Sequence, residues 1–271
     1  MTTERPPRAA LADLLQIERQ DNGLYRAAPE SFWGGYACGD LLAKMALAAG
    51  REANAAATSL HASFVGQAIA DEPATIRVSS ALGAQRTVRM EQRGAPICDA
   101  AFRFDPRAGA LAYQSPARLD GIVAPEELPS EAETGALEGW AMYAVGPVET
   151  RRVSRHGALA ANEEPTWTGW LAPRAPIPTD PISTVAALVF LGEYRSHWGV
   201  ERRLGDAFFS TELTLNDFAL WIHAPVRWDD YFFVSTRSDV AAEGRTLSRR
   251  EIFTRRGALV ASAVWQLSAS P

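Results

Sequence analysis

The chain of 271 residues is long enough for one large domain or two of ordinary size. Hydrophobic residues make up 47% and charged residues 22%, the composition of a globular protein in water, and a net charge of −5 argues against nucleic-acid binding. Two cysteines far apart in the sequence make no disulfide framework. No signal peptide and no membrane-spanning stretch is visible, so we expect a cytoplasmic protein.

The first half of the chain has the pattern of two short strands, a helix and a run of strands. Residues 14–27 predict strands around the turn at Asp21-Asn22-Gly23, and residues 35–49 predict a helix of small and apolar side chains. Four alternating stretches follow, which predict strands at residues 59–65, 75–82, 84–92 and 97–105. One helix followed by antiparallel strands is an α+β pattern in which the helix lies on the sheet.

The second half repeats this order after a proline-rich connection. Asp180-Pro181 marks the start of a helix expected over residues 182–194. Strands are expected around it at residues 142–151, 163–172, 213–223, 231–239, 246–254 and 259–267. A repeated order of elements indicates a duplicated domain. We therefore expect an N-terminal unit at residues 1–118, a linker at 119–137 and a C-terminal unit at 138–271.

One carboxylate among apolar neighbours is the first candidate for chemistry. Alternation on the strand over residues 213–223 places Asp217 on the same face as Leu215 and Trp221. A carboxylate in such company is costly unless it is solvated, paired or used. Asp217 is therefore either a solvent-facing residue at a frayed strand end or a general base. His223 lies six strand residues away, roughly 20 Å, which favours a structural role for it.

Other catalytic motifs are missing from the sequence. It has no Gly-x-Ser-x-Gly elbow, no phosphate-binding loop and no close His/Cys cluster for zinc. The sequence thus gives no reason to expect a metal.

Several stretches, in order and spacing, resemble the acyl-CoA thioesterase II (TesB-like) family over nearly the whole chain. They are FWGG at residues 32–35, HASF at 61–64, WIHAP at 221–225 and GALVAS at 257–262. The resemblance implies a double hot-dog fold of the α+β class: two tandem hot-dog units, each an antiparallel sheet wrapped around a central helix. Hot-dog hydratases instead pair Asp and His around an Asn-Pro segment, and Asn216-Asp217 lacks that proline and spacing.

The family resemblance also implies an activity. A TesB-like protein is a hydrolase of lipid metabolism that cleaves acyl-CoA thioesters to free acid and coenzyme A without a cofactor. It further implies a cytoplasmic homodimer, an acyl chain in an apolar tunnel between helix and sheet, and the coenzyme nucleotide near surface arginines. The alternative is a non-catalytic acyl-CoA or acyl-ligand binding protein with a degenerate active site.

The family's catalytic Asp, Thr and Gln orient a water molecule, and the resemblance places them on this chain. The Asp falls on Asp217, four residues before the tryptophan of WIHAP, and the Thr falls on Asp239. The Gln falls on Trp265, with Gln266 displaced by one residue and therefore on the other strand face unless a bulge intervenes. The catalytic candidates are thus Asp217, Asp239 and Gln266, with two of three family positions substituted.

The remaining candidates concern the bound substrate. Because a thiolate leaves readily, a thioester needs mainly an aligned water and a polarised carbonyl. Backbone N–H groups at a helix start could polarise it, and Gly34-Gly35-Tyr36 is the candidate, although the glycines could instead only let the helix enter the sheet. Ser238 is the nearest hydroxyl to the missing Thr. Asp239 could share a proton or water with Asp217 or be a solvated turn residue. Trp265 could fill the space where the amide would hold water.

Overall fold

Twelve strands of the chain form one continuous antiparallel sheet. The computed structural model describes residues 10–29, 31–32, 35–36, 38–69, 72–80, 83–105, 113–114, 117, 119–137, 146–154 and 166–270. The order of the strands across the sheet is β1-β2-β6-β7-β8-β5-β11-β14-β13-β12-β10-β9. Their bounds are β1 Glu18–Asp21, β2 Leu24–Ala27, β5 Ser59–Phe64, β6 Ala74–Ser80, β7 Gln85–Gln92, β8 Ala95–Arg103, β9 Val148–Arg152, β10 Thr166–Pro173, β11 Glu212–Ile222, β12 Phe232–Ala242, β13 Arg245–Thr254 and β14 Leu259–Ser270.

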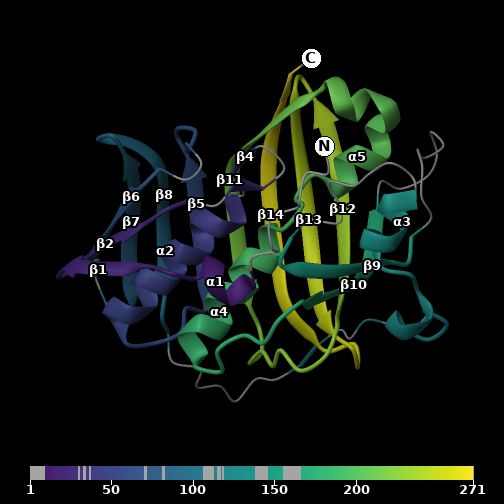
Figure 1. Ribbon diagram of the computed structural model, residues 1–271, viewed down its shortest axis with the longest axis horizontal. Helices are drawn as coiled ribbons and strands as arrows, with labels where there is room; N and C mark the ends of the chain where they lie inside the picture. The colour runs from purple at the N-terminus through teal and green to yellow at the C-terminus, as the bar shows by residue number, and fades with distance from the viewer. Residues whose placement is uncertain are drawn as a thin grey trace, which may run out of the picture.

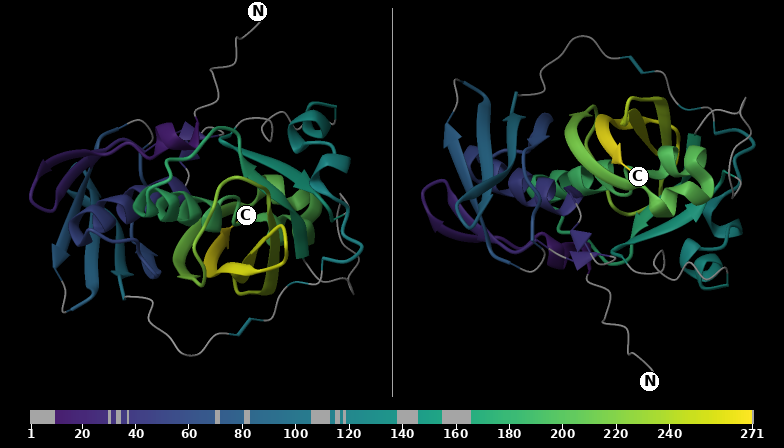
Figure 2. Two further views of the ribbon diagram at one scale, coloured as in Figure 1. Left: turned by 90° about the horizontal axis from the view of Figure 1, so that it is seen from below. Right: turned by 90° about the horizontal axis from the view of Figure 1, so that it is seen from above.

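Two long helices lie side by side against one face of this sheet. Helices α2 (Cys38–Ala53) and α4 (Pro181–Glu193) pack on each other, and the two halves of the sheet curve around them (Figures 1 and 2). The halves join where β5 of the first unit pairs with β11 of the second. The α+β class and the two sheet-and-helix units expected from the sequence are confirmed.

The amphipathic strands explain why the two long helices cover only one face of the sheet. On β11, Phe218, Leu220 and Ile222 are buried against the helices, while the residues between them point away. We call the sheet face turned away from α2 and α4 the outer face. Alternation with period two therefore gives this sheet one face packed on the helices and an outer face that is accessible over the first unit. In the second unit, Leu119, Ile122 and Leu128 cover part of the outer face.

Several local features differ from the sequence prediction. Helix α2 begins at Cys38, and Gly35–Tyr36 instead form the short strand β4, which pairs with β3 (Ser31–Phe32); Gly34 lies outside the described residues. The short helices α1 (Leu11–Leu14), α5 (Trp198–Leu204) and η3 (Gly205–Ser210) were not expected.

The segment expected as a linker, residues 119–137, also contains regular structure. It includes the 3-10 turn η1 (Pro125–Glu127) and helix α3 (Glu131–Leu137), which packs against β9. The start of α3 is a capping box, because Ser130 and Glu133 each accept a hydrogen bond from the other's backbone N–H. No helix among the described residues has the length and apolar character needed to cross a membrane.

The start of α4 agrees with its predicted N-terminal signal and gives a stability prediction. Asp180 is the N-cap, and its Oδ1 accepts hydrogen bonds from the backbone N–H groups of Ile182 at 3.1 Å and Ser183 at 2.9 Å. We expect Asp180→Ala to lower the free energy of unfolding by about 1 kcal/mol, because two helix donors lose their partner. Urea unfolding measures this. Asp180→Asn is the matched control and keeps the cap; equal losses in both variants would contradict the capping role.

Candidate active site

A bulge in β11 decides where Asp217 points. Leu215 lies opposite Leu267 of β14, and the next paired residue is Asp217, opposite Gln266, so Asn216 is one extra residue in β11. The extra residue shifts the alternation by one position. Leu215 is therefore buried whereas Asp217 is exposed on the outer face, which corrects the sequence prediction that the two share a face.

The bulge also places Asp217 on the face of the sheet that carries Gln266. Residues directly opposite each other on antiparallel strands project from the same face, so Gln266 is the neighbour of Asp217 on β14. The sequence allowed Gln266 to replace the family Gln only if a bulge intervened. The bulge in β11 meets this condition. Trp265 lies on the opposite face and is buried.

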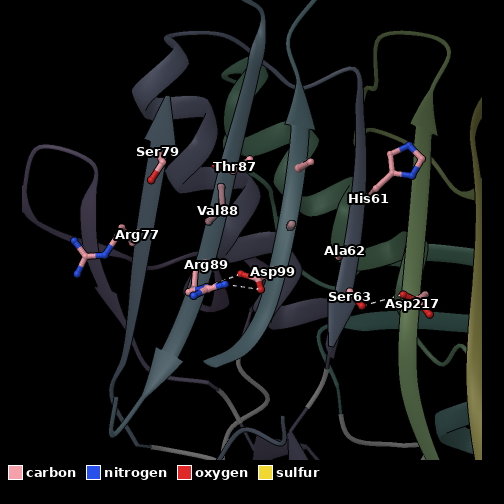
Figure 3. A pocket seen from close by; sticks show the side chains of 12 residues that line it. His61, Ala62, Ser63, Arg77, Ser79, Thr87, Val88, Arg89, Asp99 and Asp217 are labelled. Carbon is pink, nitrogen blue, oxygen red and sulfur yellow. Dashed lines mark hydrogen bonds and ion pairs between the residues drawn. The ribbon is translucent and has the colours of Figure 1, made fainter. Parts of the chain in front are cut away.

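A residue of the first unit completes the surroundings of Asp217. Ser63 of β5 lies opposite Asp217, and its hydroxyl donates a hydrogen bond to Asp217 Oδ1 at 3.0 Å (Figure 3). Sequence reasoning did not find Ser63, although the alternation of polar His61 and Ser63 around Ala62 marks an accessible strand face. Both units thus contribute to the site.

Asp217 stands at one end of an open groove on the outer face. The groove has a volume of about 660 Å³ and extends from β11 over β5, β8 and β7 to β6. Small outward side chains such as Ser79 and Thr87 leave room along its floor (Figure 3). Asp217 is therefore exposed to solvent at a hollow of the sheet surface that is large enough to hold part of a substrate.

The far end of the groove is basic. Arg89 makes a bidentate ion pair with Asp99, at 2.7 Å from Nε to Oδ1 and 2.9 Å from Nη2 to Oδ2. The hydrogen bond to Asp99 raises the pKa of Arg89, followed by the charge attraction between them. Arg77 of β6 lines the far end of the same groove, with its guanidinium directed away from Arg89 (Figure 3), and makes no hydrogen bond or ion pair with any residue that the structure describes.

His61 does not form a proton relay with Ser63 and Asp217. It lies on the same face of β5 as Ser63, but its ring contacts the edge of Trp221, with ring centroids 5.2 Å apart. Within the described part of the chain, neither Ser63 nor Asp217 hydrogen-bonds to the His61 ring. The arrangement therefore differs from a Ser-His-Asp triad, in which the imidazole lies between the hydroxyl and the carboxylate.

Asp239 does not lie beside Asp217. Two strands separate β12 from β11, so the two carboxylates are roughly 14 Å apart at the strand spacing of a sheet. Asp239 is instead ion-paired with Arg237 at 2.8 Å and Arg249 at 3.2 Å. The predicted sharing of a proton or water between the two aspartates is wrong. Of the alternative, a solvated turn residue, the solvent exposure is confirmed, but Asp239 lies in strand β12 rather than in a turn.

Ser238 and Trp265 belong to the interior of the second unit. Ser238 is buried on the inner face, in contact with Gly199 of α5. Trp265 donates a hydrogen bond from Nε1 to the carbonyl oxygen of Ser196 at 3.1 Å and is 1% exposed. Neither side chain reaches the groove, so the substrate-binding roles predicted for them are wrong for a site at Asp217.

The N-terminus of α2 is occupied by a side chain of the second unit. The backbone N–H of Gly39 donates to Glu193 Oε2 at 2.7 Å, and Ser196 donates to Glu193 Oε1 at 2.8 Å. Gly35 and Tyr36 precede this helix start. The predicted carbonyl-polarising role of the Gly34-Gly35-Tyr36 segment at a helix N-terminus is therefore corrected: the helix begins later, and Glu193 accepts its Gly39 N–H.

The expected acyl tunnel between helix and sheet does not lead to Asp217. The space between α2, α4 and the sheet is filled by a continuous core of buried apolar side chains, and Asp217 lies on the other side of the sheet. A thioester must therefore reach Asp217 from the outer face.

The cysteines are not suited to act as nucleophiles. Burial raises the pKa of Cys98 to about 12, and the neighbouring Asp99 charge acts in the same direction. Burial and then the Glu193 charge raise the pKa of Cys38 well above its ordinary value. A thiolate is therefore scarce at neutral pH at both positions. Among the described residues, no three His, Cys, Asp or Glu side chains are grouped as metal ligands.

Comparison with known proteins decides the family. A family profile described as acyl-CoA thioesterase C-terminal domain matches residues 125–268, more than half of the chain. The chain belongs to the acyl-CoA thioesterase family. The resemblance recognised in the sequence is thereby confirmed, and hydrolysis of acyl-CoA thioesters is the activity of the family.

Solved structures confirm the double hot-dog fold. The acyl-CoA thioesterase II TesB2 of Mycobacterium marinum superposes with a TM-score of 0.79 at 21% identity, covering 96% of this chain and 98% of its own. A tesB protein of Mycobacterium avium subspecies paratuberculosis has a TM-score of 0.77 at 18% identity with the same coverage. A hot-dog protein of unknown function from Alicyclobacillus acidocaldarius has a TM-score of 0.74 at 16% identity, again covering 96% and 98%. A search of curated protein sequences finds no match.

Proposed function

We propose that this thioesterase hydrolyses acyl-CoA on the outer face of its sheet, with Asp217 as the general base. The observation that supports this most is the placement of Asp217 at a groove, hydrogen-bonded by Ser63 and directly opposite Gln266. Ser63 holds one carboxylate oxygen, which leaves the other free to accept a proton from water. Asp239 is not part of this proposed site, and Gln266 takes the position of the family amide.

The reaction needs only these groups and water. Asp217 accepts a proton from a water molecule as the water oxygen attacks the thioester carbonyl carbon. The carbon–sulfur bond then breaks, the thiolate of coenzyme A leaves, and the proton held by Asp217 returns to the sulfur. The amide of Gln266 can donate an N–H to the attacking water or to the carbonyl oxygen.

We also propose a setting for this activity, by analogy with the family. We place the enzyme in cytoplasmic lipid metabolism, acting on acyl-CoA as a homodimer. Sedimentation or light scattering of the purified chain tests the dimer, and a monomeric mass across the working concentration range would contradict it.

A thioester hydrolysis assay tests the proposed activity. We expect release of free coenzyme A from acyl-CoA substrates, measured with a thiol reagent over a series of acyl chain lengths. The rival role is acyl-CoA binding without hydrolysis, by a protein that has lost part of the family's catalytic set; Trp265, which could have filled the site, packs in the core instead. Stabilisation of the protein by acyl-CoA with no thiol release at any chain length would favour that rival role and overturn the proposal.

A further inference from the structure

One row of residues crosses the outer face of the sheet through Asp217. Its side chains are mostly charged on one side of Asp217 and mostly apolar on the other. Towards the first unit, the residues in register are Ser63, Asp99, Arg89 and Arg77, on β5, β8, β7 and β6. Towards the second unit they are Gln266, Leu247 and Val240, on β14, β13 and β12. Because residues in register share a face, these side chains form one line across the sheet.

Charge divides the first-unit side of this row. Asp99 is neutralised by its bidentate pair with Arg89, whereas Arg77 makes no such pair with the residues described. The groove therefore carries one unpaired negative charge at Asp217 and one unpaired positive charge at Arg77. An anionic group is repelled from the first position and attracted to the second.

The second-unit side of the row is apolar. Leu247 is 39% exposed and Val240 is 50% exposed, and both are large hydrophobic side chains on the outer face of the sheet. They lie two and three strands from Asp217, immediately beyond Gln266. Leu247 and Val240 follow directly after Asp217 and Gln266 along the row. An apolar acyl chain that extends from a thioester at Asp217 would therefore cover these two side chains.

We propose that acyl-CoA lies across the outer face with its coenzyme on the first unit and its acyl chain on the second. Its coenzyme arm runs along the groove of the first unit and places a phosphate at Arg77, and its acyl chain covers Leu247 and Val240. Four strand spacings put Arg77 roughly 19 Å from Asp217, a span suited to an extended pantetheine arm. This inference rests on the proposed function, because it orients the thioester carbonyl at Asp217.

The coenzyme end is tested by removing one cation. We expect Arg77→Ala to raise KM for octanoyl-CoA about tenfold, with kcat within about twofold, because one charge-assisted contact to a phosphate is lost. Hydrolysis of the octanoyl thioester of N-acetylcysteamine, which has no phosphate, is expected to stay unchanged. Arg256→Ala is the matched control: Arg256 is an exposed arginine in the β13–β14 turn and does not line the groove.

Two outcomes would overturn this direction of binding. Equal effects of Arg77→Ala on both thioesters, or no effect on either, would remove Arg77 from phosphate binding. If instead Arg77 holds a carboxylate at the far end of the acyl group, the variant would impair ω-carboxyacyl thioesters of N-acetylcysteamine, and the substrate would lie in the opposite direction.

The acyl end is tested by a polar replacement. Leu247→Asn is expected to lower kcat/KM for octanoyl-CoA several-fold relative to acetyl-CoA, because the longer chain loses apolar contact. Unchanged chain-length preference would exclude Leu247 from acyl binding.

Binding of free coenzyme A separates this inference from the proposed function. Calorimetry with free coenzyme A does not depend on hydrolysis, and Arg77→Ala is expected to weaken it about tenfold. If the enzyme hydrolyses no thioester but binds coenzyme A through Arg77, the proposed function fails and the coenzyme subsite stands. If the enzyme hydrolyses thioesters but the variant binds coenzyme A unchanged, the proposed function stands and the coenzyme subsite at Arg77 fails.

Discussion

Replacing Asp217 by asparagine is expected to lower kcat for acyl-CoA hydrolysis about a hundred- to a thousandfold, with KM nearly unchanged. An amide of the same size still accepts the hydrogen bond from Ser63, but it cannot take a proton from water. General-base catalysis contributes in this range, so the loss measures the chemical step rather than binding. Steady-state kinetics with saturating substrate, and a thermal melt to verify folding, make the measurement.

Asp239→Asn is the matched control for this prediction. Asp239 is an aspartate on the same sheet, but it is ion-paired with Arg237 and Arg249 three strands away. We expect its kcat to stay within about twofold of the unmodified enzyme, because Asp239 lies outside the proposed site and surface ion pairs contribute little to stability. Activity that survives Asp217→Asn but not Asp239→Asn would move the chemistry to β12.

The alternation of residues predicted the strands because each has one face in the core. The strand expected over residues 213–223 is β11, Glu212–Ile222, and the helix expected after Asp180-Pro181 is α4. Duplication was likewise readable from the repeated order of elements. Asp217 became a candidate because a carboxylate contrasts with apolar neighbours, and this contrast is visible even when the face of the strand is assigned incorrectly.

The composition of the site could not be read from alternation alone. A single extra residue in β11, Asn216, puts Asp217 on the same face as Gln266. No glycine or proline lies beside Asn216, so the sequence gives no sign of a bulge there. Its side chain is held by a hydrogen bond to Ser268 Oγ at 2.6 Å, a contact between residues distant in sequence. Ser63 was missed for the same reason, since only the pairing of β5 with β11 brings it to Asp217.

Short elements were missed where tertiary contacts define them. Helix α5 has seven residues and no side-chain N-cap, so little in its own sequence favours a helix. Its close approach to β12 depends on Gly199, because a Cβ there would lie 2.8 Å from the backbone nitrogen of Ser238. The start of α2 was misplaced because its capping group, Glu193, comes from the other unit.

Glu193 is expected to make the stability of the fold fall as pH rises from about 4.5 to about 7. Burial raises the pKa of Glu193 to about 7 from its ordinary 4.5, although the hydrogen bonds from Ser196 and Gly39 and the charge of Arg250 act in the opposite direction. Between these values the folded chain keeps a proton that the unfolded chain releases. The contribution of Glu193 is therefore fully present below pH 4.5 and is lost as pH rises through 7.

Neither His197 nor Arg250 changes charge in this window, so neither obscures the titration of Glu193. Burial, followed by the charges of Arg195 and Arg250, lowers the pKa of His197 to about 3, so that imidazole stays neutral. Burial lowers the pKa of Arg250 to about 9, so it remains charged below pH 7. Protonated Glu193 keeps both contacts, since its carbonyl oxygen accepts from Gly39 and its hydroxyl donates to Ser196 Oγ.

Glu193→Gln isolates this effect because the amide can make the same two contacts without titrating. The free energy of unfolding, measured by urea titration at a series of pH values, is expected to fall by up to about 3 kcal/mol more in the unmodified protein than in the variant between pH 4.5 and 7.5. The exposed Glu127→Gln is the control and is expected to leave the difference unchanged. Parallel curves for Glu193→Gln and the unmodified protein would mean that Glu193 is already ionised in the fold at pH 4.5, with the Gly39 N–H and the Arg250 charge outweighing its burial.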